Sequence, residues 1–385
     1  MIDQFEKITC NGCKACKELC PQKAITYECD SYGFWFPKVD YTKCVKCGNC
    51  VKKCPNKSQP ENKYEMPDVK AAWSNDSEVR LGSTSGGLFY ELAKAVLQNN
   101  GYVAGCVYDK NFKGAHHVII NSISDLKPLM VSKYVESDTE GIYSKVKDAL
   151  QTRNRVMFVG SPCQCAGLQV CLDRKYDNLI TVDFLCRGAN SPKAHRKYVE
   201  YLENEFGGKM VSLRSKDKRN GWEHFGQAAT FDNGKEYYAS RDKDLRVVAY
   251  HRGNLMVRES CSDCKFKTLP RYADITLGDF WGIKSEEVED IDKGVSLCFI
   301  NSKKGRDLLD EIKNEITCID KSLEEAKKGN MAIYSSATYS ANRDAFLSSL
   351  DMLPFDKLVA KYKTKDPSVF KRGMNKIYRI IGGRK

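Results

Sequence analysis

The chain has 385 residues, of which 42% are hydrophobic and 29% are charged, enough for two or three domains with at least one sizeable core. No run approaches about 18 consecutive apolar residues, and the opening MIDQFEKITC has no apolar export segment, so we expect a cytoplasmic protein without a membrane span. The formal net charge of +12 counts all 18 cysteines as neutral, so it does not by itself indicate nucleic-acid binding.

Two copies of one cysteine spacing lie near the N-terminus. Residues 10–21 are CNGCKACKELCP and residues 44–55 are CVKCGNCVKKCP, so both follow C-x2-C-x2-C-x3-C-P. In bacterial iron–sulfur sites with this run, the fourth cysteine binds the other cluster. The spacing therefore predicts two [4Fe–4S] clusters. The first set of ligands is Cys10, Cys13, Cys16 and Cys54, and the second set is Cys20, Cys44, Cys47 and Cys50.

Zinc and disulfides are the other uses considered for these cysteines. Zinc sites usually have two C-x2-C pairs, and the triple spacing leaves one thiolate too many in each loop for a zinc ribbon. A disulfide framework is typical of short secreted chains, whereas this chain is long and starts without an export signal. Both alternatives are therefore less favoured than iron–sulfur clusters.

Residues 1–66 are expected to form an α+β, ferredoxin-like domain that holds both clusters. The segment YECDSYGFWFPKVD at 27–40 predicts a hairpin with its turn at Asp30-Ser31-Tyr32-Gly33. The polar segment PNKSQPENKYEMPD contains three prolines and predicts a linker that ends near Asp68.

Residues 67–345 are expected to form an α/β domain with a mixed, largely parallel sheet. The alternation of helices and strands predicts that its ligand site lies at the carboxyl ends of the strands. Helices are predicted at 86–101, 139–153, 164–173, 192–207 and 303–329. Strands are predicted at 102–109, 116–120, 155–160, 178–186 and 271–279, with a hairpin in 227–240 around Asn233-Gly234.

Two motifs in this domain indicate ligand contacts. STSGG at 83–87 precedes a predicted helix, where backbone N–H groups, hydroxyls and glycines suit a phosphate, although such letters also form ordinary capped loops. RYADITLGDFWG at 271–282 predicts a strand whose Gly-Asp turn places Asp279 and Trp281 beside a ligand. The alternative there is a buried strand with a structural aspartate.

A further group of cysteines lies near the ends of predicted elements. Cys163 follows one strand, Cys186 follows another, and Cys261 and Cys264 form a C-x2-C pair. This third set can supply four thiolates to one more [4Fe–4S] cluster, with Cys165 as a rival ligand. Free cysteines also serve as small buried hydrophobic residues, which is the competing interpretation. The other five, interpreted as structural, are Cys29, Cys106, Cys171, Cys298 and Cys318.

Five motifs in a fixed order carry a resemblance: STSGGLF, SKYVES at 132–137, FVGSPCQCAGL, FLCRGANSP, and CSDCK followed by ADITLGDFWG. Over about residues 5–300 the chain resembles the coenzyme F420 hydrogenase/dehydrogenase beta-subunit family. The resemblance implies that the α/β domain binds FAD together with a [4Fe–4S] cluster, and it favours the third set as cluster ligands. Nothing in the sequence identifies the deazaflavin itself. The implied FAD contacts are Ser83, Thr84, Ser85, Gly86, Gly87, Lys133, Tyr134, Ser137 and Asp279.

The resemblance also implies an enzyme, an FAD- and [4Fe–4S]-dependent oxidoreductase. A low-potential donor such as ferredoxin would pass electrons through the clusters to FAD and on to a small organic molecule, with a sugar or glycan precursor as one candidate. The alternative is an electron-transfer subunit of a larger redox complex, of the hydrogenase or dehydrogenase beta-subunit type. No catalytic acid is assigned, although His251 lies nearest to the third set among the five histidines.

Charge is the last feature that the sequence supplies. Each oxidised cluster with four thiolates carries about −2, so three clusters lower the net charge to roughly +6 and leave little support for nucleic-acid binding. Residues 346–385 are expected to form a basic C-terminal tail, with ten Lys or Arg and two Asp from Phe355 onward. This tail either makes weak contact with an anionic membrane surface or an acidic partner, or is a solvated terminus. The oligomeric state is left open.

Overall fold

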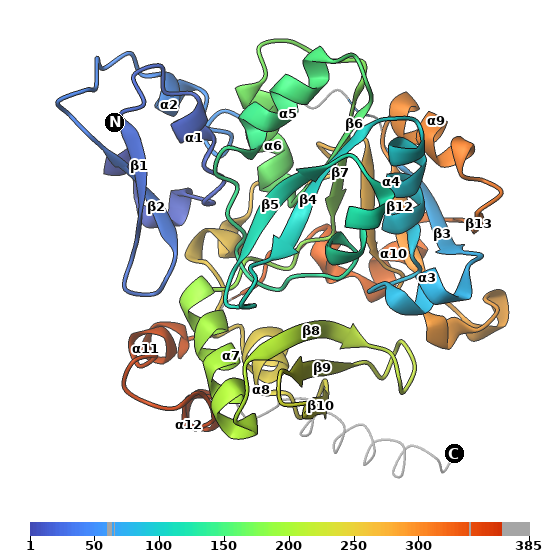
Figure 1. Ribbon diagram of the computed structural model, residues 1–385. Coiled ribbons are helices and arrows are strands. Elements are labelled where there is room, and N and C mark those ends of the chain that lie inside the picture. The colour runs from blue at the N-terminus through green and yellow to red at the C-terminus, as the bar shows by residue number, and fades with distance from the viewer. Residues whose placement is uncertain (60–63, 65, 339, 364–385) are drawn as a thin grey trace, which may run out of the picture.

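The computed structural model describes residues 1–59, 64, 66–338 and 340–363. These residues form an N-terminal domain, an α/β domain around an eight-stranded sheet, and a smaller unit around a three-stranded sheet (Figure 1). The α-helices are α1 Ala15–Glu18, α2 Asn49–Lys52, α3 Ser77–Gly82, α4 Leu88–Gln98, α5 Ile142–Gln151, α6 Pro162–Cys171, α7 Pro192–Phe206, α8 Leu245–Val247, α9 Lys303–Glu311, α10 Leu323–Gly329, α11 Arg343–Ser348 and α12 Phe355–Tyr362.

The strands are divided among three sheets. The N-terminal domain has β1 Ile25–Cys29 and β2 Trp35–Val39, and the three-stranded sheet has β8 Met210–Asp217, β9 Gly226–Phe231 and β10 Glu236–Ser240. The eight-stranded sheet contains β3 Asp68–Ser74, β4 Tyr102–Tyr108, β5 Ala115–Ile120, β6 Val156–Val159, β7 Leu179–Phe184, β11 Ile275–Asp279, β12 Ser296–Ile300 and β13 Ile316–Lys321.

The N-terminal domain repeats one local structure around its two cysteine runs. In each run a one-turn helix, α1 or α2, begins after a residue in the left-handed conformation, Lys14 with φ 58° or Gly48 with φ 78°. Between them β1 and β2 pair antiparallel from Ile25↔Val39 to Cys29↔Trp35. The predicted hairpin and its turn are thus confirmed.

The eight-stranded sheet has the order β13-β3-β12-β11-β7-β6-β4-β5. The pairs β11–β7, β7–β6 and β6–β4 are parallel, and the four other neighbouring pairs of described strands are antiparallel. The sheet is mixed, as expected, but the expectation that it is largely parallel is wrong. None of β3, β12 and β13 was predicted from the sequence, and these strands make the antiparallel half.

Helices cover both faces of this sheet. Alternate side chains of β12 point to opposite faces, so Leu297 and Phe299 pack near α10, whereas Cys298 and Ile300 pack with α4 and α9. On the face opposite to α4 and α9, α5 and α6 pack against β6. The N-terminal domain lies next to α5 and α6 (Figure 1).

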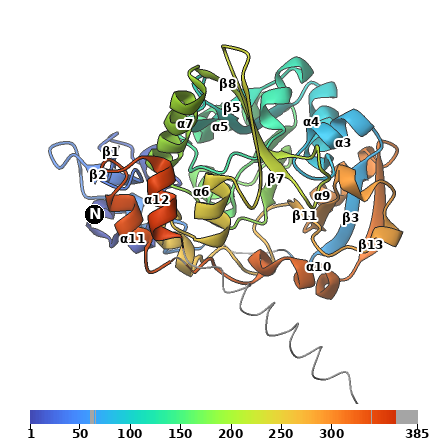
Figure 2. The same cartoon turned by 90° about the horizontal axis from the view of Figure 1, so that it is seen from below.

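The smaller unit packs α7, α8, α11 and α12 around the sheet β10-β9-β8. Ser191 caps α7 by accepting a hydrogen bond from Ala194 N, and Gly207 ends the helix in the left-handed conformation, as the sequence predicts. Phe34 of the β1–β2 turn is buried in this core, and Figure 2 shows β1 and β2 beside α11 and α12. The N-terminal domain therefore contacts both other parts of the chain.

Two C-terminal predictions differ from the structure. A single helix over 303–329 is wrong, because β13 separates α9 from α10 and pairs with β3. The expected tail begins within α11, and Phe346 and Leu358 are buried in the core, so the packed chain extends through α12. Residues 364–385 lie outside the described part of the chain. No helix among the described residues is long and apolar enough to cross a membrane.

Candidate functional site

The structure brings the first and second cysteine sets together around two separate cavities. A cavity of about 710 Å³, open to solvent, is lined by all four cysteines of the first set. Another of about 350 Å³ is lined by all four cysteines of the second set. In each cavity three cysteines come from one run and the fourth from the other run, which is the crossed arrangement predicted from the spacing.

These cysteines line two cavities and are not arranged around the position of a single metal ion. Within the described residues, no three His, Cys, Asp or Glu side chains are arranged to hold a single metal ion. Burial raises the pKa of the Cys16 thiol to about 12, although its hydrogen bond with the Tyr27 hydroxyl opposes this shift. Ligation by iron removes such a proton outright, so the environment suits a metal-bound thiolate better than a free one.

The cysteines of the third set come together at the carboxyl ends of β6 and β7. Cys163 and Cys264 pack against the same small cluster of Ala166, Phe266 and Tyr272. Ala189 N, three residues after Cys186, donates to Cys261 Sγ at 3.4 Å. Burial raises the pKa of the Cys163 thiol, and neighbouring Cys264 and Cys186 raise it further.

The rival ligand Cys165 points elsewhere. It is fully buried in the core between α6 and the sheet, where its Sγ lies 3.8 Å from Gly160 O and 3.7 Å from Val182 O. Of the cysteines interpreted as structural, Cys298 is buried and Cys106 and Cys171 are partly buried. Cys29 and Cys318 are exposed, so packing does not account for them.

Helix α6 connects the first set to the third set. It begins at Pro162, directly before Cys163, and Gly167 lies one turn further along the same face. A Cβ atom placed on Gly167 would lie 3.4 Å from Cys13 Cβ, so the loop of the first set packs directly on this helix. Thr139 Oγ1 and Tyr143 OH both donate to Cys13 O, at 3.0 and 2.7 Å, and fix that loop.

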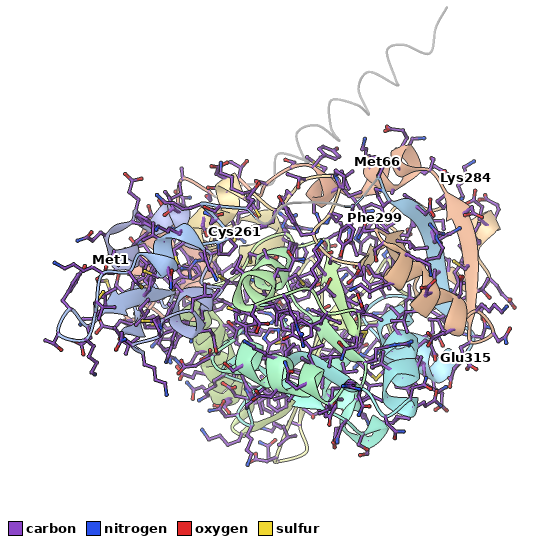
Figure 3. All side chains as sticks on the ribbon, turned by 90° about the horizontal axis from the view of Figure 1, so that it is seen from above. Met1, Met66, Cys261, Lys284, Phe299 and Glu315 are labelled. Carbon is purple, nitrogen blue, oxygen red and sulfur yellow. The ribbon has the colours of Figure 1, made fainter. Side chains whose placement is uncertain are left out.

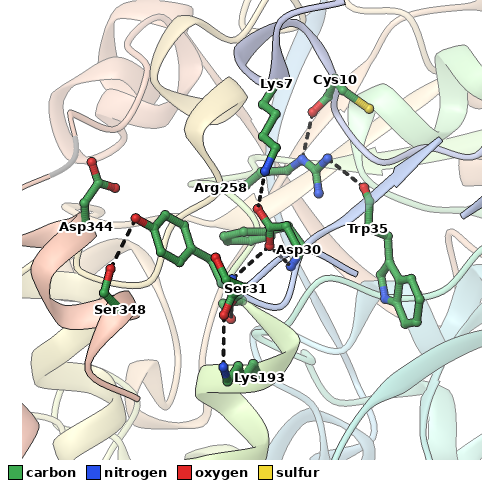
Figure 4. A network of polar contacts seen from close by, with 12 residues as sticks. Lys7, Cys10, Asp30, Ser31, Trp35, Lys193, Arg258, Asp344 and Ser348 are labelled. Atoms are coloured by element: carbon green, nitrogen blue, oxygen red, sulfur yellow. Dashed lines mark hydrogen bonds and ion pairs between the residues drawn. The ribbon is translucent and has the colours of Figure 1, made fainter. Parts of the chain in front are cut away.

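A buried ion pair provides a second connection between the same two sets. Arg258 and Glu136 are 1% and 6% exposed, and Arg258 Nη1 donates to both carboxylate oxygens at 2.9 and 2.8 Å. Arg258 Nε donates to Cys10 O at 2.7 Å and Nη2 to Trp35 O at 2.9 Å (Figure 4). Burial by itself lowers the pKa of Arg258. Glu136 and Cys10 raise it by a larger amount, so the pKa of Arg258 is raised overall. Arg258 also stands three residues before Cys261, which Figure 3 places between Met1 and Phe299.

Segment 132–137, SKYVES, joins the other motifs at this edge of the sheet. Ser132 N donates to Thr84 Oγ1 at 2.9 Å, and Asn190 Nδ2 donates to Tyr134 O at 3.1 Å. At the far end, Gln164 Nε2 donates to Ser137 Oγ at 3.0 Å. The motifs that contain Thr84, Gln164 and Asn190 therefore meet around this one segment, and Gln164 directly follows Cys163 of the third set.

Loop 83–87 is held mainly by the protein itself. Ser85 Oγ donates to Val295 O at 2.8 Å, and Gly86 N donates to Ser296 Oγ at 3.0 Å. A Cβ on Gly86 would come within 2.6 Å of Ala72 O in β3 and 2.7 Å of Ser296 N in β12, so this glycine permits loop 83–87 to pack closely on both strands. Gly87 has φ 91° and starts α4, and Ser83 is 6% exposed. Packing therefore accounts for Ser85 and Gly86 without a ligand.

Aromatic and charged side chains gather beside Tyr134. Its ring centroid lies 5.7 Å from that of Tyr250 and 5.8 Å from that of His251. The buried Lys216 forms an ion pair with Asp279, and Trp222 Nε1 donates to the same carboxylate at 2.9 Å. We call Tyr134, Lys216, Tyr250, His251 and Asp279 the Tyr134 site. Tyr250 OH donates to Gly188 O at 3.1 Å, so the site adjoins the third set.

Basic groups with unused donors surround this region. Arg187 Nε, Arg214 Nε and Arg246 Nη1 are buried and have no hydrogen-bond partner among the described residues. Arg214 Nη2 donates to Leu81 O, two residues before loop 83–87. Burial lowers the pKa of Lys133 to about 8. The surroundings are therefore positive and suit an anionic ligand.

Burial and neighbouring cations also set the state of the histidine in the Tyr134 site. Burial and the charges of Arg187, Lys216 and Arg246 lower the pKa of His251 to about 3, so it is neutral at physiological pH. His117 and His195 are buried away from this site, His116 pairs with Asp109, and His224 is exposed.

Several residues of the site were not identified from the sequence. Glu136 lies inside SKYVES and Arg187 inside FLCRGANSP. A charged residue within a mostly uncharged motif could have indicated that each belongs to the site. Arg258 carries the same signal, three residues before CSDCK. Lys216 has none, because it belongs to the basic run RSKDKRN, which is typical of a solvated surface.

Comparison with known proteins gives two family matches. Residues 153–325 match the C terminus of the beta subunit of coenzyme F420 hydrogenase/dehydrogenase, and residues 9–58 match a 4Fe-4S dicluster domain. A solved chain of the xenon-derivatised F420-reducing [NiFe] hydrogenase complex from Methanosarcina barkeri is 17% identical, with a TM-score of 0.46 and coverage of 80% of this chain and 100% of that chain. No curated protein matches. The chain therefore combines a 4Fe-4S dicluster region at 9–58 with a region at 153–325 that is similar to the C terminus of the coenzyme F420 hydrogenase/dehydrogenase beta subunit.

Proposed function

We propose that this protein is an iron–sulfur electron-transfer subunit, which moves single electrons between its N-terminal clusters and a third cluster in the α/β domain. The packing of the first set's loop on the helix of Cys163 carries this proposal. Of the two functions expected from the sequence, the electron-transfer subunit also agrees better with the family match. A sugar or glycan substrate has no separate support.

The order of the sets supports a relay. Cys16 of the first set and Cys50 of the second are buried in one small cluster, and Cys13 of the first set lies against Gly167 of α6, one turn after Cys163 of the third. Arg258 contacts the first set through Cys10 O, and its charge acts on Cys261. The three sets thus follow one another from the N-terminal domain to the Tyr134 site.

FAD is the proposed acceptor at the end of this relay. The residues fit its anionic diphosphate, because Arg214 Nε is a buried, unpartnered donor beside loop 83–87 and Lys133 adds a cation. Thr84, Tyr134 and Ser137 lie along the segment that joins this loop to the third set, whereas Ser85, Gly86 and Asp279 already bond within the protein. When bound, a flavin exchanges electrons singly or in pairs.

The chain's own residues would hold and insulate the proposed flavin. Lys216 stays charged because Asp279 and Tyr134 outweigh the effect of burial on its pKa, and it can stabilise negative charge on a bound ring. Lys218 Nζ donates to Arg80 O, Ser85 O and Lys293 O and thereby fixes loop 83–87 beside it. Neutral His251 can accept or donate a hydrogen bond without adding charge.

The relay is tested with Cys186→Ser in anaerobically reconstituted protein. We expect this variant to lose the iron of one cluster, about four atoms per chain, while the two N-terminal clusters keep their EPR signals. Reduction of protein-bound FAD by reduced ferredoxin should slow by at least about tenfold, which corresponds to about 1.4 kcal/mol in the barrier. Iron analysis, EPR and stopped-flow absorbance measure these three quantities.

Cys318→Ser is the matched control, because Cys318 is exposed on β13 and belongs to none of the three sets. It should retain the full iron content and the wild-type rate. The proposal fails if Cys186→Ser keeps all of its iron, or if flavin is reduced at the wild-type rate without the third cluster. Fluorescence titration of Arg214→Gln with FAD tests the diphosphate contact, and unchanged affinity would contradict it.

A further inference from the structure

The second cavity holds Cys47, the one cysteine of the three sets that is exposed. Cys47 is exposed and Val45, two residues before it, is 62% exposed, and both line this cavity. By contrast, the loop of the first set packs on α6 and receives hydrogen bonds from Tyr143 and Arg258. A partner protein can therefore approach the relay at the second set.

Four exposed lysines lie within three residues of the cysteines that line this cavity. Lys43 precedes Cys44, Lys46 precedes Cys47, and Lys23 and Lys52 follow Cys20 and Cys50 within three residues. Lys52 Cε lies 3.7 Å from where a Cβ on Gly48 would stand, so this side chain covers the cysteine loop. We call Lys23, Lys43, Val45, Lys46, Cys47 and Lys52 the docking patch.

One lysine of the docking patch, Lys43, is paired with a nearby carboxylate, and the other three pair with no described residue. Asp3 accepts a hydrogen bond from Tyr41 OH at 3.0 Å, and Asp40 accepts from Thr42 Oγ1 at 2.6 Å while pairing with Lys43 at 3.0 Å. No Asp or Glu occurs from residue 41 to residue 59. Lys23, Lys46 and Lys52 form no ion pair with any described residue.

We propose that the docking patch binds a small acidic protein that carries single electrons, and that the second cluster exchanges electrons with it. This inference rests on the proposed function. Lysines around an exposed valine match a partner whose carboxylates surround an apolar spot over its own redox centre. In each transfer one electron leaves the reduced carrier and one enters the second cluster, with no bond made or broken and no proton moved.

The test compares two double charge reversals that change the net charge equally. Lys46→Glu/Lys52→Glu alters the patch, and Lys313→Glu/Lys328→Glu alters exposed residues just after α9 and in α10, on the opposite side of the molecule (Figure 1). The probe is a reduced acidic plant-type [2Fe–2S] ferredoxin, and stopped-flow absorbance follows reduction of the clusters. A carbodiimide cross-linking experiment with mass mapping gives a readout that is independent of electron transfer.

At low ionic strength we expect the patch variant to be reduced about tenfold more slowly than wild type, and the control variant to react normally. The difference should vanish near 1 M salt, where the screening length is about 3 Å. Reduction by the cationic methyl viologen radical should not slow in the patch variant. Cross-links from wild type should fall on Lys23, Lys43, Lys46 or Lys52.

The outcomes separate this inference from the proposed function. If viologen reduces all clusters but ferredoxin reacts equally with both variants and cross-links elsewhere, the docking patch is wrong and the relay stands. If neither donor reduces the clusters of wild-type protein, the relay itself fails, and the docking proposal falls with it.

Discussion

Arg258 connects the N-terminal domain with segment 132–137. It donates to Cys10 O and Trp35 O in the N-terminal domain and to Glu136 in segment 132–137. Its guanidinium also lies 4.4 Å from the ring centroid of Phe36. Among the described residues Arg258 forms an ion pair with Glu136 and with no other carboxylate, so the balance between these two residues affects the local field at the first and third sets.

We expect Glu136→Gln to raise the reduction potentials of the first and third clusters. The substitution leaves Arg258 unbalanced, and a unit charge about 10 Å away at an effective dielectric constant of about 20 contributes roughly 1.7 kcal/mol. This corresponds to about 70 mV for one electron. EPR-monitored redox titration measures the shift.

Glu140→Gln is the control for this substitution. Glu140 is 49% exposed and pairs with Lys14 and Lys17 at the same boundary between domains. Solvent screens that charge, so the potentials should move little. Equal shifts in the two variants, or none in Glu136→Gln, would remove Arg258 and Glu136 from the tuning of the clusters.

Loop 83–87 shows how one element can serve packing where the sequence indicates a ligand. We expect Gly86→Ala to lower the free energy of unfolding by about 2–3 kcal/mol, because the new Cβ would meet Ala72 O and Ser296 N at 2.6 and 2.7 Å. Urea unfolding of protein without added FAD measures this loss.

Gly234→Ala is the comparison for Gly86→Ala. Gly234 has φ +80° but nothing lies within 4 Å of its added Cβ, so only backbone strain of about 1 kcal/mol is expected. If Gly86→Ala were as stable as wild type and instead lost flavin affinity, the loop would be a ligand contact and not a packing element.

Whether a helix or strand could be predicted from the sequence depended on whether local residues or distant parts of the chain stabilise it. The hairpin around Asp30–Gly33 and helix α7 carry local turn and cap residues, and both were predicted. Strand β13 was missed because mostly exposed side chains give it no apolar run, and it exists through its ladder with β3, far away in the sequence. Val295–Ile300 is a continuous apolar run after Gly294 except for Ser296, so β12 could have been recognised.

In the cofactor region too, groupings set by local spacing were predictable, and groupings set by the fold of the whole molecule were not. Cysteine spacing is local, so the grouping of the first two sets was predictable from the two runs. The third set depends on β6, β7 and the 261–264 loop meeting at one edge, which spacing alone left open. The Lys216–Asp279 pair joins two separate sheets, so the identity of its partner required the fold.

Buried histidines should make the stability of the folded chain depend on pH. Burial lowers the pKa of His117 to about 4 and that of His195 to about 3, against about 6.5 in an unfolded chain. The unfolded state therefore binds more protons below pH 6.5, so stability is constant above that pH and falls as pH decreases toward these lower values. Each histidine lowers the free energy of unfolding by about 1.4 kcal/mol as the pH falls from 7.5 to 5.5.

His195→Gln isolates one of these contributions. The amide can still donate to Phe112 O, which His195 Nε2 contacts at 2.9 Å. We expect the stability difference between pH 7.5 and 5.5, measured by anaerobic urea unfolding, to shrink by about 1.4 kcal/mol. The exposed His224→Gln should leave it unchanged. An equal loss in both variants would assign the pH dependence elsewhere.

The exposure of Cys47 has a consequence in air. Dioxygen and peroxide reach a centre with a solvent-facing thiolate before they reach one whose loop is packed against α6. Brief oxidation should therefore release about four iron atoms from the outermost position first, with the inner EPR signals still present. Loss of the second cluster then stops electron transfer from the donor, while the first and third clusters remain intact.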